Sequence, residues 1–226
     1  MNEKIHAIWL GGIMPPLAQI CLDDWKKQGF EFKLWTEKDP IIQSWIEGCR
    51  FAKECYRRKL YAFVSDYLRV KILSEFGGLY LDTDVTVNKN PFVLFESCDF
   101  SAGYEKDNVL GTAILYSIKG SLIIRELVRF YEDDVFFSDL YMGPSVLNHI
   151  INKHGAKNMN GVSLYPTSYF YSYTGKEKYY NKPNDAYLIH WFQYSWKKEK
   201  GLIFLKSKNK GFLGKLYIWQ KYFLRF

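Results

Sequence analysis

The sequence predicts an α/β fold, and three observations lead to that prediction. Short apolar segments that suit buried strands alternate with longer segments of helical periodicity. Glycine pairs mark the boundaries, as at Gly11-Gly12 and Gly77-Gly78. The chain has 226 residues, of which 48% are hydrophobic and 24% charged. It is therefore long and apolar enough to bury one sizeable core, and it is not an intrinsically disordered chain.

The first 81 residues contain three expected strands and four expected helices. The first strand is closed by Gly11-Gly12 and by Pro15-Pro16, and the first helix ends at Gly29. The fourth helix has the strongest pattern and stops at Gly77-Gly78, where glycine can adopt a left-handed cap. Strands are expected at residues 4–10, 30–35 and 79–81, and helices at residues 17–28, 39–48, 51–59 and 61–76.

The second half of the chain has a weaker pattern. Residues 100–103 and 112–116 are expected to be extended, and residues 121–131 and 144–154 to be helical. After Gly161 the chain is rich in tyrosine and asparagine, and its local pattern predicts no particular element.

The net charge of +7 is concentrated at the carboxyl end of the chain. Residues 195–226 hold nine basic residues and one acid, a net +8, which leaves −1 for residues 1–194. Nucleic-acid enzymes usually spread lysine and arginine along a groove of the body, so this distribution disfavours a nucleic-acid partner. We expect a catalytic domain over residues 1–200 and a basic aromatic tail over residues 201–226.

Four cysteines are scattered along the chain at positions 21, 49, 55 and 98, and none forms a CxxC pair. Such cysteines are most often reduced, buried thiols. No apolar run approaches the roughly 18 residues of a spanning helix, and the apolar stretch near the amino end is too short for a signal sequence. These features predict a cytoplasmic protein.

The expected helix at residues 61–76 carries charges on two opposite faces. At about 100° per residue, Arg69 lies near Asp66, whereas Lys71 and Glu75 lie on the other side and suit a solvent face. Asp66 and Arg69 are flanked by apolar residues, where charges are costly unless they pair or bind a polar ligand. They form either an internal ion pair or one polar wall of a ligand cleft.

Two aspartates follow the expected strand at residues 79–81. In an extended segment residues i and i+2 point the same way, so Asp82 and Asp84 are expected to converge at the end of that strand. Two close carboxylates repel each other unless a cation or a proton lies between them, and Mg²⁺ or Mn²⁺ prefers oxygen ligands. The alternative is an ordinary aspartate-rich turn.

Three stretches together resemble one known family. They are Ile-His-Ala-Ile-Trp-Leu-Gly-Gly at residues 5–12, Ala-Phe-Val-Ser-Asp-Tyr-Leu-Arg at residues 62–69 and Phe-Gly-Gly-Leu-Tyr-Leu-Asp-Thr-Asp at residues 76–84. This combination resembles the DxD-containing sugar transferases of glycosyltransferase family 32, and it is similar to bacterial capsule and O-antigen enzymes and to the catalytic domains of glucosylating toxins. The resemblance is strong over residues 4–90, thinner over residues 101–144 and partial over residues 190–196.

The resemblance implies a GT-A (Rossmann-like) fold and a nucleotide-sugar donor. It places the base at Ile8 and Trp9, with Trp9 stacking on it, and the metal on the diphosphate at Asp82 and Asp84. It also implies that His190 completes the metal shell, with Mn²⁺ or Mg²⁺ as the cofactor, and that Trp196 covers the donor. The catalytic set is Asp66, Arg69, Asp82 and Asp84, and further donor contacts are expected from Ser65, Tyr80 and Thr83.

Three more positions fall where the family contacts the donor sugar, namely Tyr104, Asn108 and Gly111, and they are candidates only. Gly143-Pro144 resembles an element near the acceptor, although Pro144 also suits the first turn of a helix. The family is retaining, and no nucleophile stands out in this sequence. The implied function is hexose transfer, with a UDP-linked donor favoured and GDP-mannose possible.

Two other functions compete with sugar transfer. The segment Asp82-Thr83-Asp84-Val85-Thr86 fits the nucleophile loop of haloacid-dehalogenase-like phosphohydrolases, with Asp133-Asp134 as the later acidic pair. That loop normally ends the first strand of its domain, whereas at least two expected strands precede Asp82 here. The second alternative is a non-catalytic carbohydrate-binding protein, against which the intact charged residues argue.

The tail predicts where the protein acts. From residue 211 onward it mixes ten apolar or aromatic residues with Lys215, Lys221 and Arg225 and contains no acid. Such a segment suits an anionic membrane surface, although a helix docked on the domain is the alternative. We expect a peripheral position on the inner face of the cell membrane, with a lipid-linked oligosaccharide of bacterial surface polysaccharide synthesis as the acceptor.

Overall fold

The computed structural model describes residues 3–193 and 199–223. Its centre is a six-stranded mixed sheet with the order β2-β1-β3-β6-β5-β7, and a two-stranded ribbon of β4 and β8 lies beside it. The strands are β1 (Ile5–Trp9), β2 (Phe32–Thr36), β3 (Gly78–Leu81), β4 (Val85–Val87), β5 (Phe100–Lys106), β6 (Val109–Ser117), β7 (Val162–Tyr165) and β8 (Leu188–His190).

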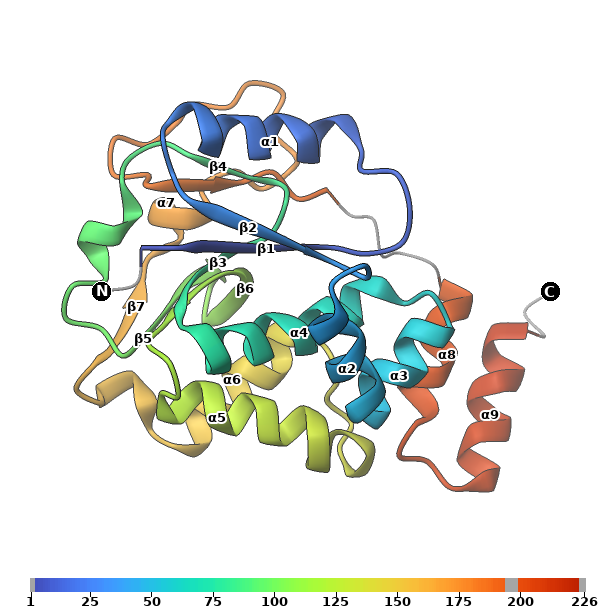
Figure 1. The fold of residues 1–226 in the computed structure, drawn as a ribbon. Coiled ribbons are helices and arrows are strands. Elements are labelled where there is room, and N and C mark those ends of the chain that lie inside the picture. The colour runs from blue at the N-terminus through green and yellow to red at the C-terminus, as the bar shows by residue number, and fades with distance from the viewer. Residues whose placement is uncertain (1–2, 194–198, 224–226) are drawn as a thin grey trace.

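Helices cover both faces of the sheet (Figure 1). Figure 1 shows α1 on one side together with the β4–β8 ribbon, and α4, α5 and α6 on the other side. The helices of the body are α1 (Pro16–Lys27), α2 (Pro40–Gly48), α3 (Arg50–Arg57), α4 (Tyr61–Phe76), α5 (Leu122–Arg129), α6 (Gly143–Lys153) and α7 (Thr167–Phe170). The α/β class expected from the sequence is thereby confirmed.

Successive side chains of β1 point to opposite faces of the sheet and belong to two separate hydrophobic clusters. Ile5 and Ala7 pack with Trp25 of α1, whereas Ile8 points to the cluster that contains α4. Strands β1 and β3 run parallel, with Ile5 opposite Leu79. Their carboxyl ends therefore meet at one edge of the sheet, which is where open α/β sheets bind ligands.

The expected elements of the first half are present with small shifts at their ends, and α4 has the bounds expected from its pattern. Strands β5 and β6 are longer than expected because they form a hairpin whose turn includes Asn108 with φ +55. Gly77 has φ +64 and ψ −171, so the expected left-handed helical cap is wrong. The chain instead leaves α4 in an extended direction that only glycine fits, since a Cβ at Gly77 would lie 2.8 Å from the Lys119 nitrogen.

All four cysteines are buried free thiols, as the sequence indicates.

His6 connects β1 to the turn between α4 and β3. The indole of Trp35 donates to His6 Nδ1 at 3.2 Å, which leaves the proton on Nε2 for the carbonyl oxygen of Gly77 at 3.0 Å. Burial lowers the pKa of His6 to about 4, although the bond to Gly77 opposes that effect. The imidazole is therefore neutral in the folded protein and supports the segment that leads to Asp82.

Replacing His6 with glutamine is expected to flatten the acid sensitivity of the fold. Between pH 6.5 and pH 4 His6 is protonated in the unfolded state but stays neutral in the folded state. The free energy of unfolding therefore decreases as pH falls through this range. The loss amounts to at most about 3 kcal/mol. Urea unfolding at pH 7 and pH 4.5 measures it, with the exposed His149→Gln as control. An equal pH dependence in His6→Gln and wild type would contradict this role.

The carboxyl-terminal segment divides into two parts. Helix α8 (Glu199–Ser207) packs on the body, because Leu205 is buried in the main cluster and the guanidinium of Arg58 lies 4.2 Å from the Phe204 ring centroid. Helix α9 (Phe212–Phe223) lies outermost in Figure 1, beside α8. These contacts make α8 part of the body. Of the tail expected from residue 201 onward, only α9 lies outside the body. Among the described helices, none has the length and apolar character that crossing a membrane requires.

Candidate active site

A pocket of about 630 Å³ opens at the carboxyl ends of β1 and β3. Its size lies within the range of small-molecule sites. Apart from the three additional candidates Tyr104, Asn108 and Gly111, all of the residues expected to bind the donor that fall within the described chain line this pocket. They are Ile8, Trp9, Ser65, Asp66, Arg69, Tyr80, Asp82, Thr83 and Asp84, together with the expected metal ligand His190. Trp196 lies outside the described residues.

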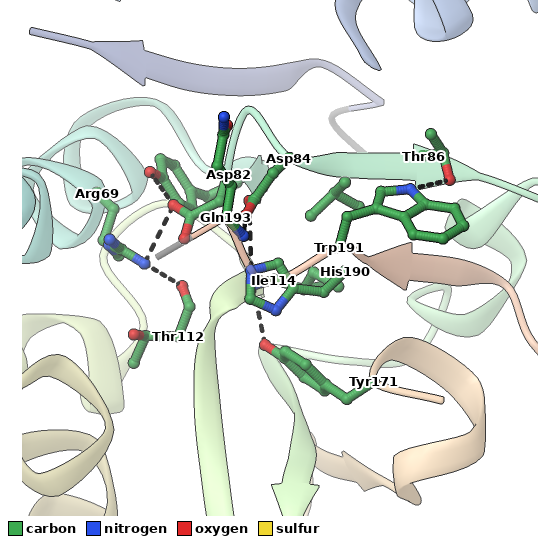
Figure 2. Close-up of polar contacts among 12 residues, drawn as sticks. Arg69, Asp82, Asp84, Thr86, Thr112, Ile114, Tyr171, His190, Trp191 and Gln193 are labelled. Atoms are coloured by element: carbon green, nitrogen blue, oxygen red, sulfur yellow. Dashed lines mark hydrogen bonds and ion pairs between the residues drawn. The ribbon is translucent and has the colours of Figure 1, made fainter. Parts of the chain in front are cut away.

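Asp66 and Arg69 form an ion pair that also lines the pocket, so the two alternatives posed by the sequence both hold. Arg69 Nη2 lies 3.1 Å from Asp66 Oδ1, and both side chains are almost fully buried. Arg69 further donates to the carbonyl oxygens of Thr112 at 2.6 Å and Ser65 at 3.1 Å. These bonds fix the guanidinium, and its Nη1 points to Asp82 Oδ1 at 3.4 Å (Figure 2).

Burial disfavours the charged form of both members of this pair, but their neighbours offset that effect to different extents. Burial raises the pKa of Asp66 to about 6, against the opposing effects of Arg69 and of the Gly143 amide, which donates to Asp66 Oδ2 at 2.9 Å. Burial alone would lower the pKa of Arg69, but Asp82, Tyr80 and Asp66 raise it above its ordinary value. Arg69 is therefore a permanent buried cation at the floor of the pocket, next to a carboxyl group that is poorly solvated.

Asp82 and Asp84 converge, but not for the reason expected from the sequence. Strand β3 ends at Leu81, and residues 82–84 form a turn that the amide of Val85 closes by donating to the Asp82 carbonyl. The expectation of an extended segment is therefore wrong, because β4 begins directly after this turn and redirects the chain. The hydroxyl of Tyr80 donates to Asp82 Oδ1 at 2.7 Å and orients that carboxylate.

The pairing of β4 with β8 brings His190 to the two aspartates. Val85 lies opposite His190 in this antiparallel ladder, and the amide of Trp191 donates to the Asp84 carbonyl. His190 Nε2 lies 3.3 Å from Asp84 Oδ1, while the amide of Gln193 donates to Asp84 Oδ2 at 2.7 Å. Figure 2 shows the imidazole and the Asp84 carboxylate facing each other, with the Trp191 indole turned toward Thr86.

The three side chains fit a divalent metal ion. One ligand atom each from Asp82, Asp84 and His190 lies within 4.8 Å of the others. His190 Nδ1 is buried without a hydrogen-bond partner among the described residues. Burial raises the pKa of Asp84, but its bonds from His190 and Gln193 outweigh that effect and lower it. Two carboxylates and one imidazole are a donor set that Mn²⁺ accepts readily and Mg²⁺ also uses.

The candidates for donor-sugar contacts lie outside the pocket lining. Tyr104 packs against the main cluster, and Asn108 is exposed in the β5–β6 turn. A Cβ at Gly111 would lie 2.5 Å from the Tyr171 ring, so this glycine serves close packing. These three residues are not among those that line the pocket.

Several pocket residues escaped the sequence interpretation. Thr112 and Glu105 come from the β5–β6 hairpin, whose irregular pairing no local pattern reveals. Lys59 comes from the connection between α3 and α4, where it has φ +58, and Tyr61 is the first residue of α4. Met142 and Pro144 bring the start of α6 to the pocket. Only Gly143-Pro144 had a sequence signal, through its resemblance to an acceptor-side element.

Gly143 permits the approach of α6 to the Asp66 carboxylate. A Cβ at this position would lie 2.5 Å from Asp66 Oδ1 and 2.7 Å from Thr112 Oγ1. Helix α6 also begins here, so the Gly143 amide is one of the unpaired amides of its first turn. The amide of Gly143 therefore provides a hydrogen bond to the buried Asp66 carboxylate, and a larger residue at this position would displace that carboxylate.

Gly143→Ala is expected to destabilise the protein by about 1–3 kcal/mol, the cost of overpacking a close contact. It should also weaken donor binding, because the Asp66 carboxylate must move. Gly48→Ala is the matched control, since Gly48 ends helix α2 with no atom within 4 Å of its added Cβ. Thermal unfolding and donor titration measure the two effects, and a Gly143→Ala protein as stable as Gly48→Ala would contradict this account.

The geometry disfavours a haloacid-dehalogenase-like site. Asp133 and Asp134 lie in a π-helical segment (Phe130–Asp134), and Asp134 pairs with Arg129 at 3.3 Å. Neither lines the pocket that contains Asp82.

Comparison with known proteins agrees with the fold and the motif. Residues 18–102 match the family described as "Glycosyltransferase sugar-binding region containing DXD motif". The chain is 24% identical over 223 residues to "Subversion of eukaryotic traffic protein A" of Legionella pneumophila, a match that covers 84% of this chain and 34% of that protein. It is 25% identical over 202 residues to the rat "Lactosylceramide 4-alpha-galactosyltransferase", covering 80% of this chain and 52% of that protein.

A solved structure shares the architecture. The "PaToxG Glycosyltransferase" superposes with a TM-score of 0.51 at 19% identity, covering 68% of each chain. This similarity concerns the fold alone. The chain spans about a third and about half of the lengths of the two curated relatives. The family match over residues 18–102, the fold and the Asp-Thr-Asp sequence at residues 82–84 agree with one another, and this chain is thus similar to DXD-containing glycosyltransferases and has a GT-A fold.

Proposed function

We propose that this protein is a metal-dependent, retaining glycosyltransferase that moves a hexose from a nucleotide sugar to a glycan. The observation that carries the proposal is the convergence of Asp82, Asp84 and His190 beside the buried Asp66–Arg69 pair in one pocket. The family match over residues 18–102 supports the sugar-nucleotide chemistry. A UDP-linked donor is favoured because of the likeness to glucosylating enzymes, with GDP-mannose as the alternative.

Different pocket residues bind different parts of the nucleotide-sugar donor. Ile8 and Trp9 at the end of β1 offer apolar surface to the base, and the indole of Trp9 is held by its bond to the Gly12 carbonyl at 2.9 Å. Asp82, Asp84 and His190 hold the divalent ion, which when bound neutralises charge on the leaving diphosphate. Asp66 and Arg69 provide an acceptor and a donor of hydrogen bonds for the sugar hydroxyls and the phosphate oxygens.

The retaining outcome follows the family resemblance. Departure of the diphosphate and approach of the acceptor hydroxyl on the same face require positioning and electrostatic stabilisation rather than a covalent nucleophile. The buried cation Arg69 lies next to the aspartate turn, where negative charge develops on the leaving group. Its fixed orientation means that little reorganisation is needed during the reaction.

Hydrolysis of a panel of sugar nucleotides tests this function. UDP-glucose, UDP-galactose, UDP-N-acetylglucosamine and GDP-mannose are incubated with the protein and with Mn²⁺, Mg²⁺ or EDTA. We expect release of one nucleoside diphosphate with Mn²⁺ and its loss with EDTA. Release of inorganic phosphate in place of the nucleoside diphosphate would support a phosphohydrolase. Sugar binding without turnover of any donor would support a non-catalytic carbohydrate-binding protein.

We also propose that helix α9 places the enzyme on an anionic membrane surface. Phe212, Leu213 and Tyr217 are 80%, 77% and 62% exposed, and Lys215 and Lys221 lie on the same helix. Exposed aromatic and aliphatic side chains beside lysines match the headgroup region of an anionic bilayer. A peripheral position on the inner face of the cell membrane would bring the pocket to lipid-linked oligosaccharides of capsule or O-antigen synthesis.

Removing residues 211–226 is expected to abolish binding to vesicles that contain phosphatidylglycerol, while donor hydrolysis stays within about twofold. Helix α8 remains in this variant, so the contacts of Leu205 with the body are preserved. Lys215→Glu/Lys221→Glu is the matched charge variant and should lose binding to anionic vesicles only. Vesicle flotation measures the effect, and unchanged flotation of the truncated protein would contradict the membrane role.

A further inference from the structure

Glu105 is a pocket carboxylate that belongs to none of the motifs described above. It lies on β5, where the pairing with β6 is irregular: Tyr104 pairs with Leu110 and Lys106 pairs with Val109. Glu105 is therefore the extra residue of a bulge. Bulges redirect one side chain out of the regular alternation, frequently next to active sites. Here the redirected side chain lines the pocket.

The Glu105 carboxylate has no hydrogen bond or ion pair with another described residue. Its side chain is half-buried, and burial raises the pKa of Glu105 above its ordinary value, partly opposed by the charges of His190 and Lys106. Asp66, Asp82 and Asp84, the other pocket carboxylates, each have hydrogen-bonded partners. A desolvated carboxylate without partners is costly, so this group is suited to a ligand that donates hydrogen bonds.

The surroundings of Glu105 exclude two kinds of ligand. Its charge acts on His190 and Asp82, yet its oxygens fall outside the group of atoms from Asp82, Asp84 and His190 that lie within 4.8 Å of one another. It is therefore next to the metal cluster rather than part of it. A carboxylate in this place also repels the donor diphosphate, which leaves uncharged hydroxyl groups as its natural partners.

The position of Glu105 along the strand indicates which hydroxyl groups reach it. Exposure increases along β5, from the buried Phe100 to the exposed Lys106, so Glu105 lies at the rim of the pocket. The groups assigned to the base, the sugar and the diphosphate lie on β1, α4 and the turn after β3. Glu105 approaches from the β5–β6 hairpin, on the solvent side, where a second substrate must enter.

We propose that Glu105 binds a hydroxyl group of the glycan acceptor and thereby orients it next to the donor. The proposal rests on the glycosyltransferase function proposed above. It assigns to the bulge in β5 the task of building the acceptor site beside the metal site. Glu105 then affects transfer to a glycan but not the binding of the donor or of the metal ion.

Glu105→Gln tests this assignment, with Lys106→Gln as the matched control at the exposed neighbour. The best donor of the panel is used with Mn²⁺, and the acceptors are the methyl glycosides of glucose, galactose and mannose. Nucleoside diphosphate release without glycoside measures hydrolysis, and glycoside product measures transfer. We expect the ratio of transfer to hydrolysis to fall about tenfold in Glu105→Gln, the effect of losing a hydrogen bond to a charged group.

The remaining measurements separate this role from others. Hydrolysis and the Mn²⁺-dependent affinity for the nucleoside diphosphate should stay within about twofold of wild type. A lower affinity would make Glu105 a metal ligand, and equal losses of transfer and hydrolysis would place its action on the donor; either result overturns the proposal. So does a wild-type enzyme that hydrolyses the donor but uses no glycoside. Wild type without any hydrolysis would instead refute the proposed function on which this inference rests.

Discussion

Asp84→Asn is expected to reduce Mn²⁺-dependent donor hydrolysis by at least about a hundredfold, because stabilisation of the leaving diphosphate by the ion is worth several kcal/mol. The fold should survive, since the asparagine amide can still accept from the Gln193 amide and donate near His190. The affinity for Mn²⁺, measured by titration, should fall together with the rate.

Asp133→Asn is the matched control for this prediction. Asp133 is exposed and lies outside the pocket lining, and a phosphohydrolase of the haloacid-dehalogenase type would need this acidic segment. We therefore expect wild-type hydrolysis from Asp133→Asn. Equal turnover by Asp84→Asn and wild type would contradict the assignment of the metal site.

Arg69→Met is expected to lower both stability and activity. It removes the partner of Asp66 and the neighbour of Asp82, and breaking a buried ion pair typically costs about 3–5 kcal/mol. For a chain of this length that corresponds to a Tm lower by roughly 10 °C. Arg69→Lys should rescue little, because an ammonium cannot reach Asp66, Thr112 and Ser65 at once.

The stability loss of Arg69→Met should depend on pH. Burial already raises the pKa of Asp66 to about 6, and without the arginine that pKa rises further. At pH 5 the carboxyl group of the variant is then protonated, and the uncompensated buried charge disappears. The difference in Tm from wild type should therefore shrink between pH 7 and pH 5. The exposed Arg125→Met serves as control, and a pH-independent difference would show that lost packing, not charge, explains the effect.

The sequence alone indicates that several of the pocket residues lie close together, because they cluster in short segments. Asp66 and Arg69 share one face of a single helix, and helical periodicity alone places them together. Trp9 ends β1 and Asp82 directly follows β3, and the carboxyl ends of parallel strands meet at one edge of a sheet. His190 was assigned only through the resemblance, since more than a hundred residues separate it from Asp84.

Other features had no local signal. The turn at Asp82–Asp84 depends on the pairing of β4 with β8. The direction of the Glu105 side chain depends on the register of β5 against β6. Helix α8 packs on the body because Leu205 is buried in the main cluster. The composition of a basic tail does not reveal this contact. Tyr104, Asn108 and Gly111 are candidates for donor contacts through the family resemblance alone, and they lie outside the pocket lining because the pairing of the β5–β6 hairpin sets their positions.

By itself, the sequence determined the α/β class, the bounds of α4, the shared face of Asp66 and Arg69 and the concentration of basic charge at the carboxyl end of the chain. These features arise from periodicity, composition and short motifs, which act over a few residues. Only the tertiary structure decided how His190 joins the aspartates, why Gly143 must be a glycine and where Glu105 points. Those outcomes depend on contacts between residues far apart in the chain, because strand register and close packing are properties of the assembled fold.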